Sequence, residues 1–390
     1  MARIPRNFAN RAVSRALSFR FLLLLLAALL VSFTGCRKKP LNPTEIRAIT
    51  REFVFAAKNV TAGKAEIGMR PEYLAQPAAA RRGPGELAAD HIYITLPPGH
   101  LGAADPGALA ALESELNRVA ESHGLARDAR SGAPGLVRFD YRRGEQRTHA
   151  IHIITPLVRR FGAPAPRAHT PSARLAIIMD DLGYDRSAAD AVFALPFPLT
   201  LSVLPNLAHS ADIAEEAHRR GYQVMLHLPM ESSNGGVKPE AIELRVGMTP
   251  ADVAGLLAEM LETVPHAIGV NNHQGSFATT DAQLMAAVMP ALRERQLFFI
   301  DSRTTTATLA YGAAVRAGVP AASRHVFLDD TPTREAVRQQ LALAVRHARQ
   351  QGFAIAIGHP HAATLAALED SLPQIEAQGV RLVFTSELVH

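Results

Sequence analysis

From residue 174 to the C-terminus, short apolar segments alternate with segments of helical periodicity. The apolar segments are expected to be strands, at residues 175–179, 199–204, 222–226, 267–270, 297–300, 325–328, 353–357 and 381–384. Helices fit between most of them, for instance at 250–262, 281–295 and 333–349. Strands that are apolar on both faces and joined by helices form parallel sheets covered on both sides. Seven or eight such units in about 215 residues favour an α/β fold of the distorted (β/α) barrel type.

An open doubly wound sheet is the alternative architecture. A dinucleotide-binding fold of that class needs a glycine-rich turn after its first strand, because backbone amides there bind phosphate. The corresponding turn in this chain is Met179-Asp180-Asp181-Leu182-Gly183, which presents carboxylates instead of amides. The sequence therefore favours the barrel.

The residues before the barrel divide into four parts. They are a signal peptide at 1–36, a polar linker with one helix at 37–89, a small α/β module at 90–160, and a linker rich in proline and alanine at 161–173. The helix of the second part is expected at 44–57. The module is expected to contain strands at 91–96, 136–141 and 148–154 and a helix at 108–123. It carries no catalytic signature.

The N-terminal leader has the pattern of a secretory signal. Five arginines precede the charge-free stretch from Phe21 to Gly35, which is shorter than the roughly 18 apolar residues expected of a membrane-spanning helix. Its end, Phe33-Thr34-Gly35-Cys36, resembles a bacterial lipoprotein cleavage box, in which the cysteine receives the lipid. The alternative is an uncleaved inner-membrane anchor in which Cys36 has no role.

Export follows from either interpretation, so we expect a periplasmic, membrane-anchored protein. Residue 37 is arginine rather than aspartate, and by resemblance to Gram-negative sorting rules this predicts an outer-membrane lipoprotein. Cys36 is the single cysteine of the chain, which excludes an intramolecular disulfide. The formal net charge of +5 comes mostly from the leader and the basic residues 37–39, so no nucleic-acid partner is expected.

Polar side chains follow six of the expected barrel strands. They are Asp180 and Asp181, residues 227–231 (HLPME), residues 271–276 (NNHQGS), residues 301–303 (DSR), Asp329 and Asp330, and residues 358–361 (GHPH). The C-terminal ends of barrel strands meet at one rim, where barrel enzymes carry their active sites. The sequence therefore predicts a functional site at this rim.

The adjacent carboxylates of Asp180 and Asp181 are the strongest sign of a metal. Two negative charges crowded at the end of a buried strand cost stability unless a cation or a shared proton offsets them. Neighbouring residues of a strand point in opposite directions, so one carboxylate would bind the ion and the other would act as a base on bound water. His227 and His273 supply imidazoles that complete a divalent site with an open position, which suits zinc.

The segments DDLGYD, HLPME, NNHQGS, IDSRT and GHP, in this order over residues 174–390, resemble the polysaccharide deacetylase superfamily, in particular its divergent branch in bacterial envelopes. The resemblance implies a distorted barrel with a metal-dependent hydrolase that removes acetyl groups from N-acetylated sugars. Matched by motif, it implies that Asp180 is the base, that Asp181 and His227 are metal ligands, and that His359 is the general acid.

The third protein ligand is left open by the sequence. The second motif of the family has two histidines four residues apart, whereas here Glu231 stands four residues after His227. His273 is the preferred third ligand, with Glu231 as the alternative; otherwise Glu231 supports the site or faces substrate. Asn272 and Ser276 would orient His273, bind substrate or form loop hydrogen bonds, and Asp301 would be a further ligand or the cap of the next helix.

Two functions remain in view. The first is a metal-dependent hydrolase, most simply with zinc, that deacetylates an N-acetylated envelope or exported polysaccharide. The second is a catalytically inactive carbohydrate-binding or scaffold protein on the same barrel, which the altered second motif would explain. A glycosidic or phosphoryl hydrolase is less favoured, because adjacent carboxylates flank a scissile glycosidic bond poorly.

Overall fold

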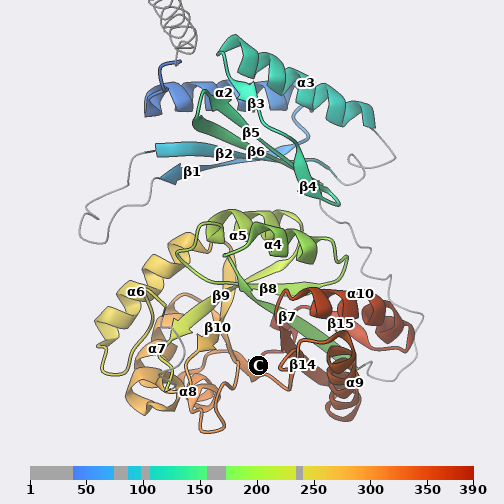
Figure 1. Ribbon diagram of the computed structural model, residues 1–390. Helices are drawn as coiled ribbons and strands as arrows, with labels where there is room; N and C mark the ends of the chain where they lie inside the picture. Colours follow the sequence, from blue (N-terminus) through green and yellow to red (C-terminus); the bar gives the residue numbers. More distant parts are fainter. Residues whose placement is uncertain (1–37, 74–86, 98–105, 156–172, 234–239) are drawn as a thin grey trace, which may run out of the picture.

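The computed structural model describes residues 38–73, 87–97, 106–155, 173–233 and 240–390, which form two separate sheets (Figure 1). The expected signal peptide, Cys36 and nearly all of the linker expected at 161–173 lie outside these residues. Among the helices that are described, none combines the length and apolar character needed to cross a membrane.

The smaller sheet has two helices on one face (Figure 1). Its strands, in spatial order, are β1 (Glu66–Tyr73), β2 (Leu87–Thr95), β6 (Gln146–Ile154), β5 (Leu136–Arg143) and β3 (Ala126–Arg127), with β4 (Ser131–Ala133) paired to β5. The helices are α2 (Pro43–Val60) and α3 (Pro106–Ser122). Phe53 of α2, Leu112 of α3 and Ile151 of β6 share the buried core between helices and sheet.

The stretch 37–89 is more than the predicted polar linker with a helix. It contains α2 and also β1, an edge strand that pairs antiparallel with β2. No residue of β1 is buried, and Pro71 lies within it, so its sequence lacks the alternation that marks a half-buried strand. The helix and strand of this stretch therefore belong to the small module.

The larger sheet confirms the predicted distorted (β/α) barrel. Its order is β12 (Ala321–Ser323), β11 (Phe298–Asp301), β10 (Ala267–Gln274), β9 (Gln223–Met230), β8 (Leu199–Val203), β7 (Arg174–Leu182), β14 (Phe353–Gly358) and β13 (Val326–Phe327), with β15 (Arg381–Val383) also paired to β7. All of these pairings are parallel. The end strands β12 and β13, which lie wholly within the described residues, are not paired to each other, so the sheet curls without closing.

Helices surround the curled sheet (Figure 1). They are α4 (Arg186–Phe193), α5 (Ser210–Arg219), α6 (Pro250–Thr263), α7 (Ala282–Glu294), α8 (Ala310–Ala317), α9 (Arg334–Gln351) and α10 (Ala362–Ala377). Alternate residues of β7 pack into two different hydrophobic clusters. Ile177 belongs to the cluster that includes helix residues, and Ile178 belongs to a second cluster formed mostly by strand residues. This alternation directs position 180 to the same side of β7 as Ile178.

The small sheet lies against the barrel helices α4 and α5 (Figure 1). Arg138 of β5 pairs with Asp190 of α4, and His152 of β6 lies 2.5 Å from the buried carboxylate of Glu216 on α5. Burial lowers the pKa of His152 well below its usual value. Polar and charged side chains therefore join the small sheet to the barrel helices, together with apolar residues such as Leu136 and Ile154, which pack in the core cluster of the barrel.

Candidate metal centre

Asp180 and Asp181 lie near the end of β7, where the strand departs from regular geometry. The register between β7 and β8 shifts between Met179 and Leu182, and Asp181 has a φ of 58°, in the left-handed region. That conformation costs a non-glycine residue about 1–3 kcal/mol. Both carboxylates approach one atom, Nε2 of His227: Oδ2 of Asp180 lies 3.6 Å from it and Oδ1 of Asp181 lies 3.2 Å from it. The irregular backbone thus brings to one site two acids that regular strand alternation would separate.

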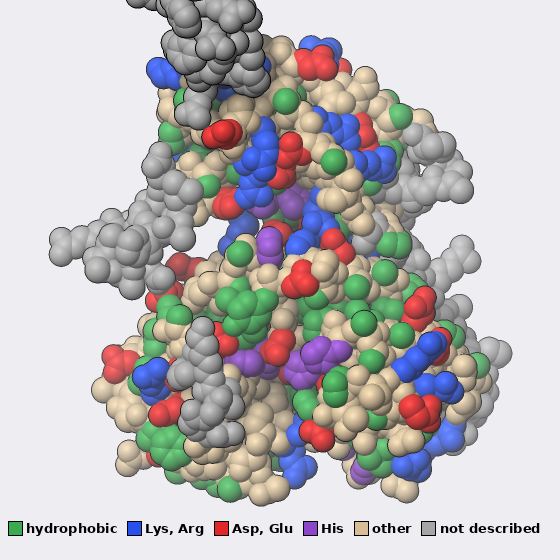
Figure 2. Space-filling model, in the orientation of Figure 1, with side chains coloured by type: hydrophobic (Ala, Val, Ile, Leu, Met, Phe, Trp, Pro, Cys, Tyr) green, Lys and Arg blue, Asp and Glu red, His purple; other side chains and the backbone are tan. Residues whose placement is uncertain are grey.

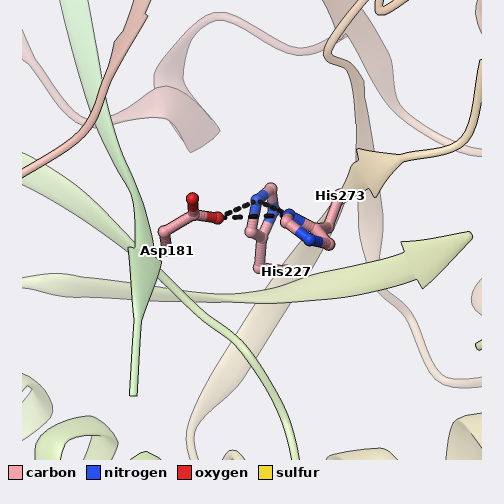
Figure 3. A group of neighbouring side chains, drawn as sticks. All are labelled: Asp181, His227 and His273. Atoms are coloured by element: carbon pink, nitrogen blue, oxygen red, sulfur yellow. Dashed lines mark hydrogen bonds and ion pairs between the residues drawn. The ribbon is translucent and has the colours of Figure 1, made fainter. Parts of the chain in front are cut away.

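Asp181, His227 and His273 converge from three strands, β7, β9 and β10 (Figure 3). Oδ1 of Asp181 lies 3.2 Å from Nε2 of His227 and 3.1 Å from Nδ1 of His273, and the two nitrogens are 3.1 Å apart. The side chain of His227 is buried, whereas that of Asp181 is 38% exposed. Histidine and acidic side chains accordingly gather on the visible face of the barrel (Figure 2).

This group fits a divalent ion. Asp181, His227 and His273 would hold it through one oxygen and two nitrogens that lie 3.1–3.2 Å from one another, the donor types that bind zinc. Sites with three protein ligands keep a further position for water or substrate. Oδ1 of Asp181 is buried and forms no hydrogen bond of regular geometry with a described residue, which leaves its lone pairs available to a cation.

Asn271 of β10 determines which ring nitrogen of His227 carries the proton. Its amide nitrogen donates to Oδ1 and Oδ2 of Asp180 at 2.9 and 3.1 Å, and a carboxylate can only accept. The amide oxygen must then face Nδ1 of His227, 3.0 Å away. Nδ1 therefore carries the proton, and the lone pair of Nε2 faces Asp181 and His273. A residue that hydrogen-bonds to the second ring nitrogen of a metal-binding histidine, and does not bind the ion, is here called its outer partner. The outer partner sets the tautomer of the histidine.

His359, which follows β14, lies beside Asp181. Its Nε2 is 3.7 Å from Oδ2 of Asp181, and its Nδ1 is 3.0 Å from Oδ1 of Asp329. The other oxygen of Asp329 accepts hydrogen bonds from the backbone N–H of His359 at 2.6 Å and the hydroxyl of Thr364 at 2.9 Å. The carboxylate of Asp329 therefore holds both the ring and the backbone of His359.

Charged neighbours shift the pKa values of three site residues in the direction opposite to the effect of burial. Burial disfavours the carboxylate of Asp181, but the imidazoles of His227 and His273 outweigh it and hold the pKa of that carboxyl far below its usual range. Burial likewise disfavours the imidazolium of His227, but Asp180 and Asp181 raise its pKa. For His359, burial is outweighed by Asp329 and the acid pair, which raise its pKa to about 9.

Glu231, the alternative third ligand, binds elsewhere. Its Oε2 accepts a hydrogen bond of 2.9 Å from the backbone N–H of Val246. Among the described residues, the close group of possible ligands around Asp181 contains His227 and His273 and does not contain Glu231. The geometry therefore favours the first of the two ligand sets that the sequence allowed.

The remaining residues predicted for the site support loops. Asn272 accepts a hydrogen bond from the backbone N–H of Ser302 and donates one to the carbonyl of Gln274. Ser276 bonds to Ser232 and Ser233. These contacts join the ends of neighbouring strands and bind none of the three candidate ligands.

Asp301 binds the segment that leads into α8. Its oxygens accept hydrogen bonds from the hydroxyl of Thr308 at 3.0 Å and from the backbone N–H groups of Arg303 and Tyr311 at 2.8 and 3.3 Å. The side chain is buried, and it is not in the group of possible ligands around Asp181. The N-cap residue of α8 is Leu309, so Asp301 is not the predicted cap itself, but its contact with the N–H of Tyr311 in the first turn favours a structural role at the start of the helix over metal binding.

Sequence reasoning missed Asn271 and Asp329. Residues two apart on a strand face the same side, so Asn271 lies on the same side of β10 as His273. This alternation could have identified Asn271, rather than Asn272, as the residue near the candidate ligands. Asp329 had no comparable signal, because an aspartate after a strand is also the usual cap of the following helix.

Comparisons with known proteins cover the whole candidate site. The profile of a family described as divergent polysaccharide deacetylase matches residues 177–389. An uncharacterized protein of Haemophilus influenzae is 40% identical over 200 residues, which are 51% of this chain and 71% of that protein. The uncharacterized protein YibQ of Escherichia coli K12 is 36% identical over 220 residues, 56% of this chain and 68% of that protein. The crystal structure of an uncharacterized protein of Agrobacterium tumefaciens C58 covers 60% of this chain and 96% of its own, with a TM-score of 0.54 at 23% identity, which supports the barrel fold.

Proposed function

The chain belongs to the divergent polysaccharide deacetylase family, and we propose that it removes acetyl groups from N-acetylated glycans by metal-dependent hydrolysis. The observation that carries the proposal is the convergence of Asp181, His227 and His273, with Asp180 beside His227 and His359 beside Asp181. The family name supports the reaction class, and the side chains supply the groups that the reaction needs.

Zinc is the proposed ion, held by Asp181, His227 and His273. Two imidazoles and one carboxylate suit zinc, and sites with three protein ligands keep a position for water or substrate. When bound, such an ion polarises a carbonyl oxygen and acidifies a coordinated water.

Asp180 would be the general base. Its side chain is buried and accepts two hydrogen bonds from Asn271, which fix the carboxylate beside His227. A carboxylate held there would take one proton from the water whose oxygen attacks the acetyl carbon.

His359 would be the general acid. Asp329 fixes its Nδ1, so Nε2 faces the group formed by Asp181 and its partners. In the metal-free protein its pKa is raised to about 9, above the usual value, which favours the protonated ring that a general acid needs. When the C–N bond breaks, Nε2 would give its proton to the departing nitrogen, and the products would be acetate and a free amino sugar.

An envelope or exported polysaccharide is the proposed substrate. The leader would direct the chain out of the cytoplasm. A lipid on Cys36 would hold the protein at the outer membrane, whereas an uncleaved leader would hold it at the inner membrane, and the barrel would face the periplasm in either case. N-acetylated glycans of the envelope are within reach of a protein in that position.

The test is acetate release from N-acetylated glucosamine oligomers and peptidoglycan fragments by the purified protein with added zinc. Release that stops on chelation and in an Asp180→Asn variant is the expected result. Glycan binding without acetate release, at any zinc concentration, would contradict the proposal and favour the carbohydrate-binding alternative.

A further inference from the structure

We propose that Glu240 is a positioning residue that orients His273 as a metal ligand, and that the hydroxyl of Tyr184 holds Glu240 in place. The inference rests on the metal centre of the proposed function but does not depend on turnover. Neither residue stood out in the sequence, since Glu240 lies in the connection between β9 and α6 and Tyr184 in the turn after β7.

The two candidate histidine ligands use opposite ring nitrogens. His227 turns Nε2 toward the group and Nδ1 toward Asn271, whereas His273 turns Nδ1 toward the group and Nε2 outward. Oε1 of Glu240 lies 3.5 Å from that outward Nε2. Each imidazole therefore has one nitrogen for the ion and one for an outer partner, a neutral amide for His227 and a carboxylate for His273.

A carboxylate at Glu240 decides which tautomer His273 adopts. To bind an ion through Nδ1, the neutral ring must carry its proton on Nε2, and that N–H needs an acceptor. The side-chain amide nitrogen of Gln274 lies 3.3 Å from the same Nε2 and is a donor, which would stabilise the opposite tautomer. Glu240 can only accept when ionised, so it favours the tautomer that leaves Nδ1 free for the ion.

Tyr184 restricts the carboxylate of Glu240. Its hydroxyl lies 3.0 Å from Oε1 and 3.1 Å from Oε2, so it donates to both oxygens. Tyr184 is 56% exposed as a residue, and the side chain of Glu240 is 23% exposed. A partly exposed glutamate loses several rotamers when it is ordered, and the phenol hydroxyl limits that freedom from a turn 56 residues away in the chain.

The test compares three variants of the full chain, Glu240→Leu, Tyr184→Phe and Glu243→Leu. Glu243 lies on the same connection and bonds to Arg245 instead of a histidine, so Glu243→Leu is the matched control. Zinc affinity is measured by chelator competition, and the ligand environment by the visible absorption of bound cobalt(II).

Glu240→Leu is expected to weaken zinc binding about 10- to 100-fold and to alter the cobalt spectrum, because loss of an outer partner of a metal-binding histidine has effects of that size. Tyr184→Phe is expected to weaken binding by a smaller factor, and Glu243→Leu to match the unsubstituted protein. Glu240→Leu with unchanged affinity and spectrum would overturn the inference and leave the proposed function intact. No zinc or cobalt binding by the unsubstituted protein would overturn both.

Discussion

The pH dependence of stability offers a direct test of the environment of His359. In the metal-free protein, burial of the ring is outweighed by Asp329, Asp180 and Asp181, which raise its pKa from 6.5 to about 9. A pKa that is higher in the folded state than in the unfolded chain means that the protonated ring stabilises the fold. That stabilisation is fully present below pH 6.5 and is lost as the pH rises through about 9.

The size of the effect follows from the two pKa values. A rise from 6.5 to about 9 corresponds to about 3 kcal/mol of free energy of unfolding. The side chain of His359 is 20% exposed, so solvent screens these charges only in part. Bound zinc would offset the negative charge of Asp181, so the effect should be smaller in the metal-loaded protein.

The assay is urea unfolding of the chelator-treated protein from pH 6 to 10, with His359→Gln as the variant. Subtracting the variant from the unsubstituted protein removes the contribution of His227, whose pKa is also raised. His361→Gln is the matched control, since His361 is an exposed histidine in the same turn. If His359→Gln kept the full fall in stability between pH 6.5 and 9, the assigned ion pairs of His359 would be wrong.

Three further predictions concern the metal centre. Asn271→Leu should weaken zinc binding about 10- to 100-fold in chelator competition, because His227 loses the acceptor of its Nδ1–H; an unchanged affinity would contradict the assigned tautomer. His273→Ala should abolish bound zinc in metal analysis while Glu231→Gln retains it, and the reverse result would make Glu231 the ligand. Asp180→Asn should retain zinc and slow acetate release by about 100- to 10,000-fold, so an unchanged rate would exclude Asp180 as the base.

The sequence by itself was sufficient for the barrel. Apolar strands alternating with helices are a local property of the chain, and buried parallel strands have few other arrangements. The strands that were not predicted are short or exposed: β12 has three residues, and none of the residues of β1 is buried. Such strands are stabilised mainly by pairing with a neighbour, which is a contact that local periodicity does not record.

The sequence also placed Asp181, His227 and His273 at one rim, because strand ends of a parallel barrel share an edge. Only the tertiary structure decided how both acids reach His227, since a backbone irregularity at Asp181 overrides the alternation expected of a strand. It also assigned the outer partners of the two histidines, an amide at Asn271 and a carboxylate at Glu240. These partners come from other segments of the chain, and hydrogen-bond geometry between distant segments exists only after the strands have packed.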